Sequence, residues 1–492
     1  MNVEEKFINL KIENRNFING KFLIPLNNKS IKKNSPIDGR ELPELYICED
    51  KDVQIAINAA KECYEKGGWL NKDPKDKKNV LLKLASLVES NLEELALLDT
   101  YETGRSFKNY YYDSIPKAIE ALRYFSEGID KIYDHAIPPR MNSFATITRE
   151  ALGVVGLITP WNDPLVVAMW KIAPALLMGN SVVIKPAEQS SYSLLKVASL
   201  VKESGLPDGA FNVITGPGEI SGKALALNND VNGIFFTGST EVGKLIMQYA
   251  GQSNLKKVGL ECGGKSPFII SKNCNKVKKA AKVLAKNIFY NQGQICSAPS
   301  RVLIHYSLKD ELLNYLLDES EKYIPSNPLN INSEVGTMIN DLQATKVNDY
   351  IKSGISSGAK RISPERPKGF DLNNNAILPT IFCDVDLNTK VVKEEIFGPV
   401  LVVIDYDEIE EAISLANDTN YGLAASIWTD DLNEAYYVSR KIRAGIVHIN
   451  CYGDDDNTVP FGGFKESGIG KDKSIFAFDE YSNLKTTWID FN

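Results

Sequence analysis

The chain has 492 residues, of which 43% are hydrophobic and 24% are charged, as in an ordinary globular protein. This length exceeds one compact core, so two or three domains are expected. Lys and Arg number 56 against 63 Asp and Glu, a formal net charge of −7, which argues against nucleic acid or an anionic membrane as the main partner.

The N-terminal stretch MNVEEKFINL has two glutamates and no apolar core of signal-peptide length, and no run of about 18 apolar residues occurs in the chain. Seven scattered cysteines without a CxxC pair suggest reduced thiols, so a cytoplasmic location is expected. The histidines, His135, His305 and His448, lie far from one another and from any cysteine cluster. We therefore predict no metal site, and histidine-based catalysis has little support.

The middle of the chain alternates short apolar runs with amphipathic helical patterns. We predict helices at 190–204 and 243–250, and strands at 153–159, 181–185, 210–214 and 233–237. Continuously apolar strands that alternate with helices indicate a parallel, doubly wound α/β sheet.

A second series of the same kind predicts a second α/β domain. Helices lie between its strands, one of them beginning at Ile409, and the strands are predicted at 267–270, 301–305, 400–404, 424–428 and 445–449. Two outlying segments, 144–149 and 485–489, have the pattern of strands without crossover helices. Such segments suit edge pairing between subunits.

Four stretches place polar chemistry at the end of a strand, where open parallel sheets bind their ligands. They are TPWNDP at 159–164, KPAE at 185–188, FTGSTEVG at 236–243 and LECGGK at 260–265. The third is a glycine-bearing turn into a helix, whose free N–H groups suit a phosphate. Each also has a structural interpretation: Glu188 as a helix cap, Asn162 as a turn residue, Glu261 as half of a surface ion pair.

Cys296 lies in NQGQICSAPSR at 291–301, among amide and hydroxyl side chains. A structural cysteine normally has apolar neighbours. An isolated loop cysteine is more often inert than reactive, so the motif alone does not decide between the two.

Together with EEIFGPV at 394–400 and PFGGFKESG at 460–468, these motifs follow the order found in the aldehyde dehydrogenase superfamily, which the chain resembles over essentially its whole length. The resemblance implies an aldehyde dehydrogenase-like α/β fold with two doubly wound domains and a small β oligomerisation extension. It implies an NAD-binding domain at 1–128 and 150–260, a catalytic domain at 261–463, and oligomerisation segments at 129–149 and 464–492. A homotetramer built as a dimer of dimers is expected, with a dimer as the alternative.

The resemblance also implies the chemistry. Cys296 would be the nucleophile, since a thiolate attacks a carbonyl strongly and can later leave. The side-chain amide of Asn162 and the backbone N–H of Cys296 would stabilise the oxyanion. Glu261 would be the general base that activates water for hydrolysis of the thioester. The expected reaction is oxidation of an aldehyde to a carboxylic acid through a thiohemiacetal and a thioester.

The implied cofactor is NAD. Glu188, beside Lys185, would accept a hydrogen bond from a free ribose 2′-hydroxyl and repel a 2′-phosphate. Ser239 and the helix after it would meet the pyrophosphate, and Glu395 and Phe397 the nicotinamide ribose and ring. The other cofactor-binding residues predicted from the resemblance are Ile158, Thr159, Pro160, Trp161, Gly218, Phe236, Thr237, Gly238, Val242 and Gln343.

The segment 456–465, with Asp472-Lys473-Ser474, resembles that of γ-aminobutyraldehyde-type enzymes. The implied substrate is an aminoaldehyde from polyamine breakdown, of the γ-glutamyl-γ-aminobutyraldehyde type. The acidic run 454–456 would attract a cationic tail at the substrate mouth, or it is simply a solvated turn. The residues predicted to contact substrate are Asp163, Trp170, Tyr290, Asp455 and Phe461.

Asp163 is a departure, because the family usually has phenylalanine after the catalytic asparagine. In one interpretation, this carboxylate lies beside the substrate tunnel and binds an amine. In two others, it indicates that the substrate has changed or that activity is impaired.

Three alternatives remain beside the aminoaldehyde enzyme. One is a broad-specificity or betaine-aldehyde-type dehydrogenase. Another is a coenzyme A-acylating dehydrogenase, against which Glu261 argues, because such an enzyme is expected to lack the glutamate base. The last is a non-catalytic structural relative, which would need neither Cys296 nor Glu261.

Overall fold

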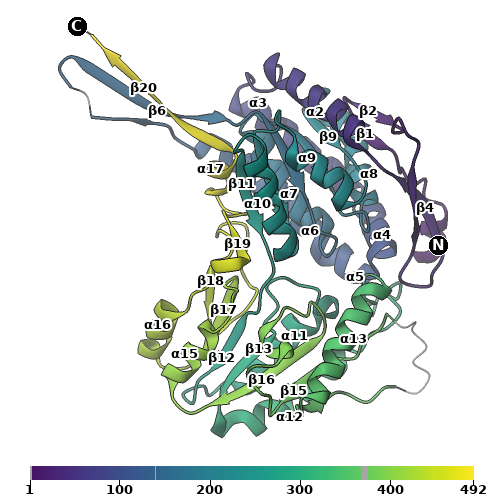
Figure 1. Ribbon diagram of the computed structural model, residues 1–492, viewed down its shortest axis with the longest axis vertical. Helices are drawn as coiled ribbons and strands as arrows, with labels where there is room; N and C mark the ends of the chain where they lie inside the picture. Colours follow the sequence, from purple (N-terminus) through teal and green to yellow (C-terminus); the bar gives the residue numbers. More distant parts are fainter. Residues whose placement is uncertain (1–2, 139, 368–374, 492) are drawn as a thin grey trace.

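The computed structural model describes residues 3–138, 140–367 and 375–491. Figure 1 shows two α/β bodies, one coloured mainly purple to teal and one teal to yellow, and an arm of strands that projects from the first body. The chain thus has the predicted α/β class, with two separate sheets and a β extension.

The first body contains an eight-stranded sheet. In spatial order its strands are β19 (Gly468–Ile469), β11 (Lys257–Glu261), β10 (Gly233–Thr237), β7 (Val154–Ile158), β8 (Ser181–Lys185), β9 (Phe211–Val213), β1 (Asn16–Ile18) and β2 (Lys21–Leu23). The strands from β11 to β9 run parallel, and the outer ones are antiparallel. Strands β7 and β8 are buried along their whole length, as their continuous apolar sequences predict.

Helices cover both faces of this sheet. One face packs against α2 (Asp50–Glu65), α9 (Lys223–Leu227) and α10 (Thr240–Gln252). The other packs against α7 (Pro164–Leu177) and α8 (Tyr192–Ser204), with α3 (Pro74–Ser90), α4 (Leu92–Thr103) and α6 (Ile115–Gly128) behind them. Two apolar cores, one on each face, result from this doubly wound arrangement.

The second body contains a seven-stranded sheet that is parallel except at β14. In spatial order its strands are β14 (Lys360–Ile362), β15 (Thr380–Cys383), β16 (Val400–Tyr406), β13 (Arg301–His305), β12 (Pro267–Ile270), β17 (Ala424–Trp428) and β18 (Ile446–Ile449). Helices α11 (Val277–Phe289) and α12 (Lys309–Ser320) cover one face, and α13 (Asp341–Ser356), α15 (Ile409–Asn417) and α16 (Leu432–Lys441) the other. The strands predicted from the sequence are all present, with ends that differ by a few residues.

Shorter elements complete the described chain. They are α1 (Val3–Ile8), the hairpin β3 (Ser30–Asn34) and β4 (Glu41–Tyr46), α5 (Phe107–Asn109), α14 (Lys390–Lys393), α17 (Ala477–Glu480) and several single turns of 3₁₀ or π helix.

The arm consists of β5 (His135–Ala136), β6 (Ser143–Ala151) and β20 (Ser482–Asp490), with the C-terminus near its tip (Figure 1). Strands β6 and β20 pair with each other in antiparallel register from Ser143↔Asp490 to Ala151↔Ser482. These segments were predicted to pair between subunits, but within one chain β6 and β20 form backbone hydrogen bonds with each other. Strand β19, from the same C-terminal stretch, joins the first sheet.

The predicted boundary at residue 261 coincides with the end of β11, after which β12 starts the second sheet. The full set of domain limits remains a prediction. Within residues 3–138, 140–367 and 375–491, no helix combines the length and apolar character needed to cross a membrane. In the same ranges, no three His, Cys, Asp or Glu side chains are grouped so as to hold a metal ion.

Candidate active site

The carboxyl ends of the central strands bring the sequence motifs to one edge of the first sheet. Ile158 of β7 pairs with Lys185 of β8 and with Phe236 of β10, and Thr237 pairs with Glu261 of β11. The stretches TPWN, KPAE, GSTEVG and CGG therefore leave the sheet side by side. This is the edge where parallel sheets bind ligands.

The loop that carries Cys296 has an unusual backbone. Asn291, Gln292 and Gly293 all have positive φ, at 50°, 55° and 68°. A Cβ on Gly293 would lie 2.2 Å from the Gly398 carbonyl oxygen, so only glycine fits there. Two left-handed non-glycine residues in a row are strained, and such strain concentrates at functional sites.

Buried glutamine amides hold this loop in place. Gln292 exchanges two hydrogen bonds with the backbone of Ile377, at 3.1 and 3.0 Å. Gln294 accepts from the Ile339 N–H at 3.0 Å and donates to the Asn291 carbonyl at 3.0 Å. The polar residues around Cys296 thus replace the backbone pairing that a regular element would supply.

Asn162 connects the first sheet to the Cys296 loop. Its side-chain Nδ2 donates to the Gln294 carbonyl at 3.0 Å, and its own carbonyl accepts from Asn291 Nδ2 at 3.3 Å. An amide group has a second N–H, which remains available to a ligand oxygen. Asn162 is therefore a fixed hydrogen-bond donor beside the cysteine.

Glu261 is buried at the end of β11, with 5% of its surface exposed. Neither carboxylate oxygen has a hydrogen-bond partner among the described residues. Burial raises the pKa of Glu261 well above its usual value, and the nearby Asp472 raises it further, while Lys171 and Lys471 oppose the shift. A carboxyl group with a raised pKa and no fixed partner is suited to proton transfer.

Burial also raises the pKa of Cys296, to about 12, and the charges of Glu261 and Glu395 add to the shift. The ligand-free thiol is therefore protonated at neutral pH.

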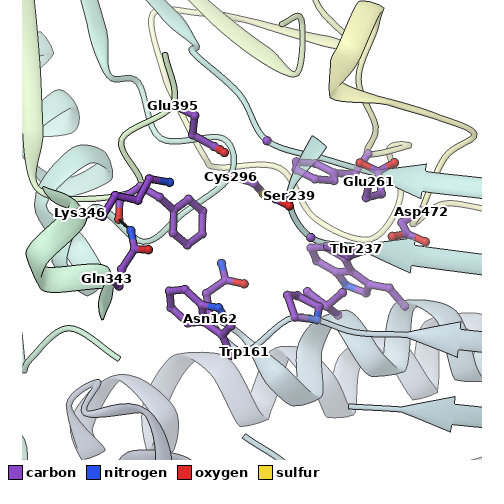
Figure 2. A pocket seen from close by; sticks show the side chains of 17 residues that line it. Trp161, Asn162, Thr237, Ser239, Glu261, Cys296, Gln343, Lys346, Glu395 and Asp472 are labelled. Carbon is purple, nitrogen blue, oxygen red and sulfur yellow. Dashed lines mark hydrogen bonds between the residues drawn. The ribbon is translucent and has the colours of Figure 1, made fainter. Parts of the chain in front are cut away.

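Cys296, Glu261 and Asn162 line one pocket of about 190 Å³. Figure 2 shows Cys296 between Glu261 on one side and Glu395 on the other, with Asn162 across the pocket. The complete lining is Pro160, Trp161, Asn162, Val167, Trp170, Thr237, Gly238, Ser239, Glu261, Gly263, Cys296, Gln343, Lys346, Glu395, Phe397, Phe461 and Asp472.

Comparisons with known proteins agree with this site. The model of the "Aldehyde dehydrogenase family" matches residues 24–487. The chain belongs to the aldehyde dehydrogenase family. It is an oxidoreductase that acts on aldehydes.

Relatives within the family cover the whole chain. The "NADP/NAD-dependent aldehyde dehydrogenase PuuC" of Escherichia coli is 44% identical over 486 residues, 99% of this chain and 97% of PuuC. The structure of γ-glutamyl-γ-aminobutyraldehyde dehydrogenase from Burkholderia cenocepacia has a TM-score of 0.96 at 42% identity, covering 100% of this chain and 99% of that one. The P. syringae indole-3-acetaldehyde dehydrogenase AldA, solved with NAD⁺, has a TM-score of 0.97 at 42% identity, covering 99% of each chain. The predicted aldehyde dehydrogenase-like fold is confirmed.

The cofactor residues predicted from the family motifs divide into two groups. Pro160, Trp161, Thr237, Gly238, Ser239, Gln343, Glu395 and Phe397 line the same pocket as Cys296. Ile158, Thr159, Lys185, Glu188, Gly218, Phe236 and Val242 lie outside that lining.

The first group is held by short polar contacts. Gln343 donates to the Phe397 carbonyl at 2.9 Å, and Phe397 itself has a φ of 57°. Glu395 accepts from the Gly264 N–H at 3.0 Å, and a Cβ on Gly263 would lie 2.2 Å from its carboxylate. The glycines of the ECGG motif therefore admit Glu395 to the pocket.

The second group includes an ion pair between the buried Lys185 and the partly exposed Glu188. Lys185 donates to the carbonyls of Pro186 and Gly216 at 2.8 and 2.9 Å, and lies 3.4 Å from Glu188. Burial lowers the pKa of Lys185, and Glu188 opposes the shift. The Glu188 side chain is 30% exposed, so its carboxylate is still accessible to a ligand.

Of the residues predicted to contact substrate, Trp170 and Phe461 line the pocket, whereas Asp163, Tyr290 and Asp455 do not. Asp163 lies 3.3 Å from Arg105 and accepts from the Ser114 hydroxyl. Arg105 also donates to the Tyr290 hydroxyl at 2.7 Å. The carboxylate expected to be free for an amine is thus half of an internal ion pair.

Asp455 is likewise paired, 2.5 Å from Lys473 and 3.5 Å from His448. Burial opposes ionisation, but the His448 hydrogen bond and the Lys473 ammonium hold the pKa of Asp455 well below its usual value. Its neighbour Asp456 accepts from the N–H and the hydroxyl of Thr458, as in a polar turn.

Several pocket residues were not predicted from the sequence. Lys346 lies one helical turn after Gln343 on α13, so the 3.6-residue period would have pointed to it. Asp472 lines the pocket and pairs with the buried Lys171 at 2.6 Å. No local sequence signal identifies the Asp472–Lys171 pair, which joins residues from opposite parts of the chain.

Proposed function

We propose that the chain oxidises an aldehyde to a carboxylic acid with NAD as cofactor, through a covalent intermediate on Cys296. The observation that carries this proposal is the placement of a thiol, an amide donor and a buried carboxyl group without a fixed partner around one pocket. These groups supply a nucleophile, an oxyanion donor and a base.

In the first step the Cys296 thiol loses its proton to solvent, its sulfur bonds to the aldehyde carbon, and the carbonyl π electrons move to oxygen. The second N–H of the Asn162 amide and the backbone N–H of Cys296 donate to that oxygen. Because Asn162 is already fixed by its contact with Gln294, little reorganisation is needed when the negative charge develops.

NAD fits the groups around the pocket. Ser239 caps the N-terminus of α10, where free N–H groups suit a pyrophosphate. Burial raises the pKa of Glu395, whose carboxylate would accept from the nicotinamide ribose, and Phe397 would contact the ring. Bound NAD would supply the hydride acceptor, and loss of hydride from the substrate carbon would leave a thioester on Cys296.

Glu261 would complete the reaction. It takes a proton from water, the hydroxide oxygen bonds to the thioester carbon, and the carbon–sulfur bond breaks to release the acid and the Cys296 thiolate. The raised pKa of Glu261 makes it a stronger base than an exposed carboxylate.

NAD is proposed over NADP because of Glu188. Its partly exposed carboxylate, held by the Lys185 ammonium, would accept from a 2′-hydroxyl and repel a 2′-phosphate. The ratio of kcat/KM with the two cofactors tests this choice, and equal efficiencies would overturn it.

The proposed substrate is an aminoaldehyde from polyamine breakdown, of the γ-glutamyl-γ-aminobutyraldehyde type. Support comes from the two relatives named PuuC and γ-glutamyl-γ-aminobutyraldehyde dehydrogenase, at 44% and 42% identity. The expectation that Asp163 and Asp455 attract a cationic substrate tail gives less support, because both carboxylates are already paired within the chain. A broad-specificity or betaine-aldehyde-type enzyme is the alternative.

We also propose a homotetramer, a dimer of dimers. The arm supports it, because its outer edge strand β20 carries exposed apolar side chains, Leu484, Trp488 and Ile489, that a partner would cover. A monomer by light scattering at micromolar concentration would contradict this assembly. The cytoplasmic location stays a prediction.

One assay tests the reaction and its alternatives. NADH formation is followed at 340 nm, with NAD, a panel of aldehydes, and coenzyme A present or absent. Turnover without coenzyme A supports the proposal, and turnover that requires it would favour an acylating enzyme. No turnover with any aldehyde would favour a non-catalytic relative.

A further inference from the structure

An ion pair outside the pocket lies against the segment that follows Glu188. Glu102, near the end of α4, has a fully buried side chain, and the ammonium of Lys33 on β3 contacts its carboxylate. The Lys33 side chain is 8% exposed. A buried carboxylate is costly unless it is paired and hydrogen-bonded, so its partners show which part of the structure it holds.

The Glu102 carboxylate caps the first turn of α8. One oxygen accepts from the Ser191 N–H at 3.0 Å, and the other accepts from the Tyr192 N–H at 2.8 Å. The first N–H groups of a helix have no partner within the helix, and a side chain at its start usually accepts from them. In α8 the residue at the start is Ser191, whose hydroxyl instead donates to the Ala187 carbonyl at 2.8 Å. The start of α8 is therefore fixed by a residue of another helix.

The Lys33 ammonium also contacts this segment directly. It donates to the Gln189 carbonyl at 3.3 Å and lies 4.2 Å from the centroid of the Tyr192 ring. The Gln189 side chain in turn donates to one oxygen of the Glu188 carboxylate at 3.1 Å. The other oxygen of Glu188 lies 3.4 Å from the Lys185 ammonium. Gln189 thus connects Lys33 to the carboxylate that, under the proposed function, accepts from the ribose of NAD.

The hairpin that carries Lys33 also supports a neighbour of Lys185. Lys185 donates to the Gly216 carbonyl at 2.9 Å. The residue before Gly216, Thr215, donates through its hydroxyl to the carbonyl of Tyr46, the last residue of β4, at 2.5 Å. Strand β4 pairs with β3. The hairpin β3–β4 therefore holds the surroundings of this ammonium at two places, although none of its residues lines the pocket.

We propose that Lys33 is a positioning residue for cofactor selection. By fixing residues 188–192, it holds the Glu188 carboxylate where that group accepts from a ribose 2′-hydroxyl and repels a 2′-phosphate. A carboxylate that is already oriented loses less conformational freedom when the cofactor binds, so NAD binds more tightly. This inference rests on the role proposed for Glu188 and adds the residue that keeps Glu188 in place.

The test measures the dissociation constants of NAD and NADP by isothermal titration calorimetry, together with kcat and KM for each cofactor at saturating 3-aminopropanal. Lys33→Met removes the ammonium but keeps a long, flexible side chain. The Kd and KM of NAD should rise by about tenfold with kcat within about twofold of wild type, because the lost contacts act on binding and not on the chemical step. The values for NADP should change by less than about twofold, since NADP does not use the Glu188 contact. The preference for NAD should therefore fall.

A double-mutant cycle with Glu188→Gln shows whether Lys33 acts through Glu188. In the Glu188→Gln background, Lys33→Met should not change the ratio of the two dissociation constants any further, since the carboxylate that Lys33 positions is already gone. Lys77→Met is the matched control. It removes another buried ammonium, which donates to the Leu70 carbonyl, and should lower stability without changing the ratio.

A purely structural role for Lys33 would weaken NAD and NADP binding alike, in either background, and would overturn the inference. An unchanged Kd for NAD in Lys33→Met would overturn it too. If Lys33→Met does not fold because Glu102 is left without a cation, Lys33→Met/Glu102→Gln removes both charges and should show the same reduced preference. A wild-type protein that binds NAD and NADP equally would instead contradict the role proposed for Glu188 itself.

Discussion

The inner end of the pocket and its rim differ in how their acidic groups are balanced. At the inner end, Glu261 is buried beside Cys296, and its carboxylate has no hydrogen-bond partner among the described residues. Asp163 and Asp455 lie outside the pocket lining, and we refer to these two residues and their partners as the rim. Each is paired with a cation of the chain itself, Arg105 or Lys473.

This difference distinguishes a residue that takes part in the reaction, Glu261, from residues that only shape the region around the pocket, Asp163 and Asp455. A group that must exchange protons during a reaction cannot be held in a strong ion pair, because the pair would fix its protonation state. Groups that only shape the pocket can be paired, and pairing then removes the net charge that a substrate would feel. We therefore expect large catalytic effects at the inner end and structural or selective effects at the rim.

The largest expected effect is at Cys296. Cys296→Ser replaces the nucleophile by a poor one and should lower kcat by about 10⁴-fold or more while NAD binding, followed by fluorescence quenching, stays nearly intact. Cys451→Ser is the control, since Cys451 is also a partly exposed thiol but does not line the pocket. Turnover near that of wild type in Cys296→Ser would refute the covalent mechanism.

Next in size is Glu261→Gln. The variant should still form the thioester, giving a burst of about one NADH per competent site, and then turn over about 10²–10⁴-fold more slowly than wild type. Rapid-quench or stopped-flow measurements separate the two phases. Loss of the burst in a folded variant would mean that Glu261 acts before hydrolysis.

The same residue predicts a pH dependence. The pKa of Glu261 is raised by burial, so steady-state turnover should fall as pH decreases through this raised value, where the base becomes protonated. Asp472→Asn removes a negative neighbour and should move that acid limb to lower pH, because the ionised form of Glu261 is then less opposed. A limb that stays in place in Asp472→Asn would contradict this origin of the shift.

The inner end was also the part that the sequence predicted best. The NQG turn before Cys296 and the polar ends of β7, β8, β10 and β11 are local patterns, and the regular spacing of a parallel sheet brings such ends together. The strand positions could be predicted because continuous apolar runs are also local patterns.

The rim could not be predicted in this way. Asp163 has its partner in Arg105, just after α4, and Lys473 reaches back to Trp170 on α7. Such pairs join residues that are distant along the chain, and nothing in the identity of an aspartate shows whether a buried cation will neutralise it. The mutual pairing of β6 and β20 was missed for the same reason.

A smaller effect is expected at the Arg105–Asp163 pair. Asp163→Asn leaves the buried Arg105 guanidinium without its closest carboxylate and should destabilise the fold by about 2–4 kcal/mol, less than for a fully buried pair because the Asp163 side chain is 27% exposed. Arg105 also donates to the Asn162 carbonyl at 3.5 Å, so kcat should fall by a few-fold as the oxyanion donor loosens. Thermal denaturation and steady-state kinetics measure the two effects.

A control for the Arg105–Asp163 pair uses phenylalanine, the residue that the family usually has at position 163. Asp163→Phe alone should be at least as destabilising as Asp163→Asn, whereas Arg105→Met/Asp163→Phe removes both charges and should recover part of the loss. A single variant Asp163→Phe that is stable and gains efficiency on aliphatic aldehydes would show instead that Asp163 contacts substrate.

The smallest expected effect concerns salt. Free carboxylates at the mouth would steer a cationic aldehyde, and its kcat/KM would then fall steeply as ionic strength screens the attraction. Because Asp163 and Asp455 are paired internally, we expect the ratio of kcat/KM for 3-aminopropanal to that for propanal to change by less than about twofold between low and high salt. A tenfold fall in this ratio would identify steering by the exposed Asp454 and Asp456, and the double variant Asp454→Asn/Asp456→Asn should then abolish it. If this ratio does not change with salt in the wild-type protein, the acidic residues do not attract the substrate through long-range charge. Selection would then depend on the shape of the pocket.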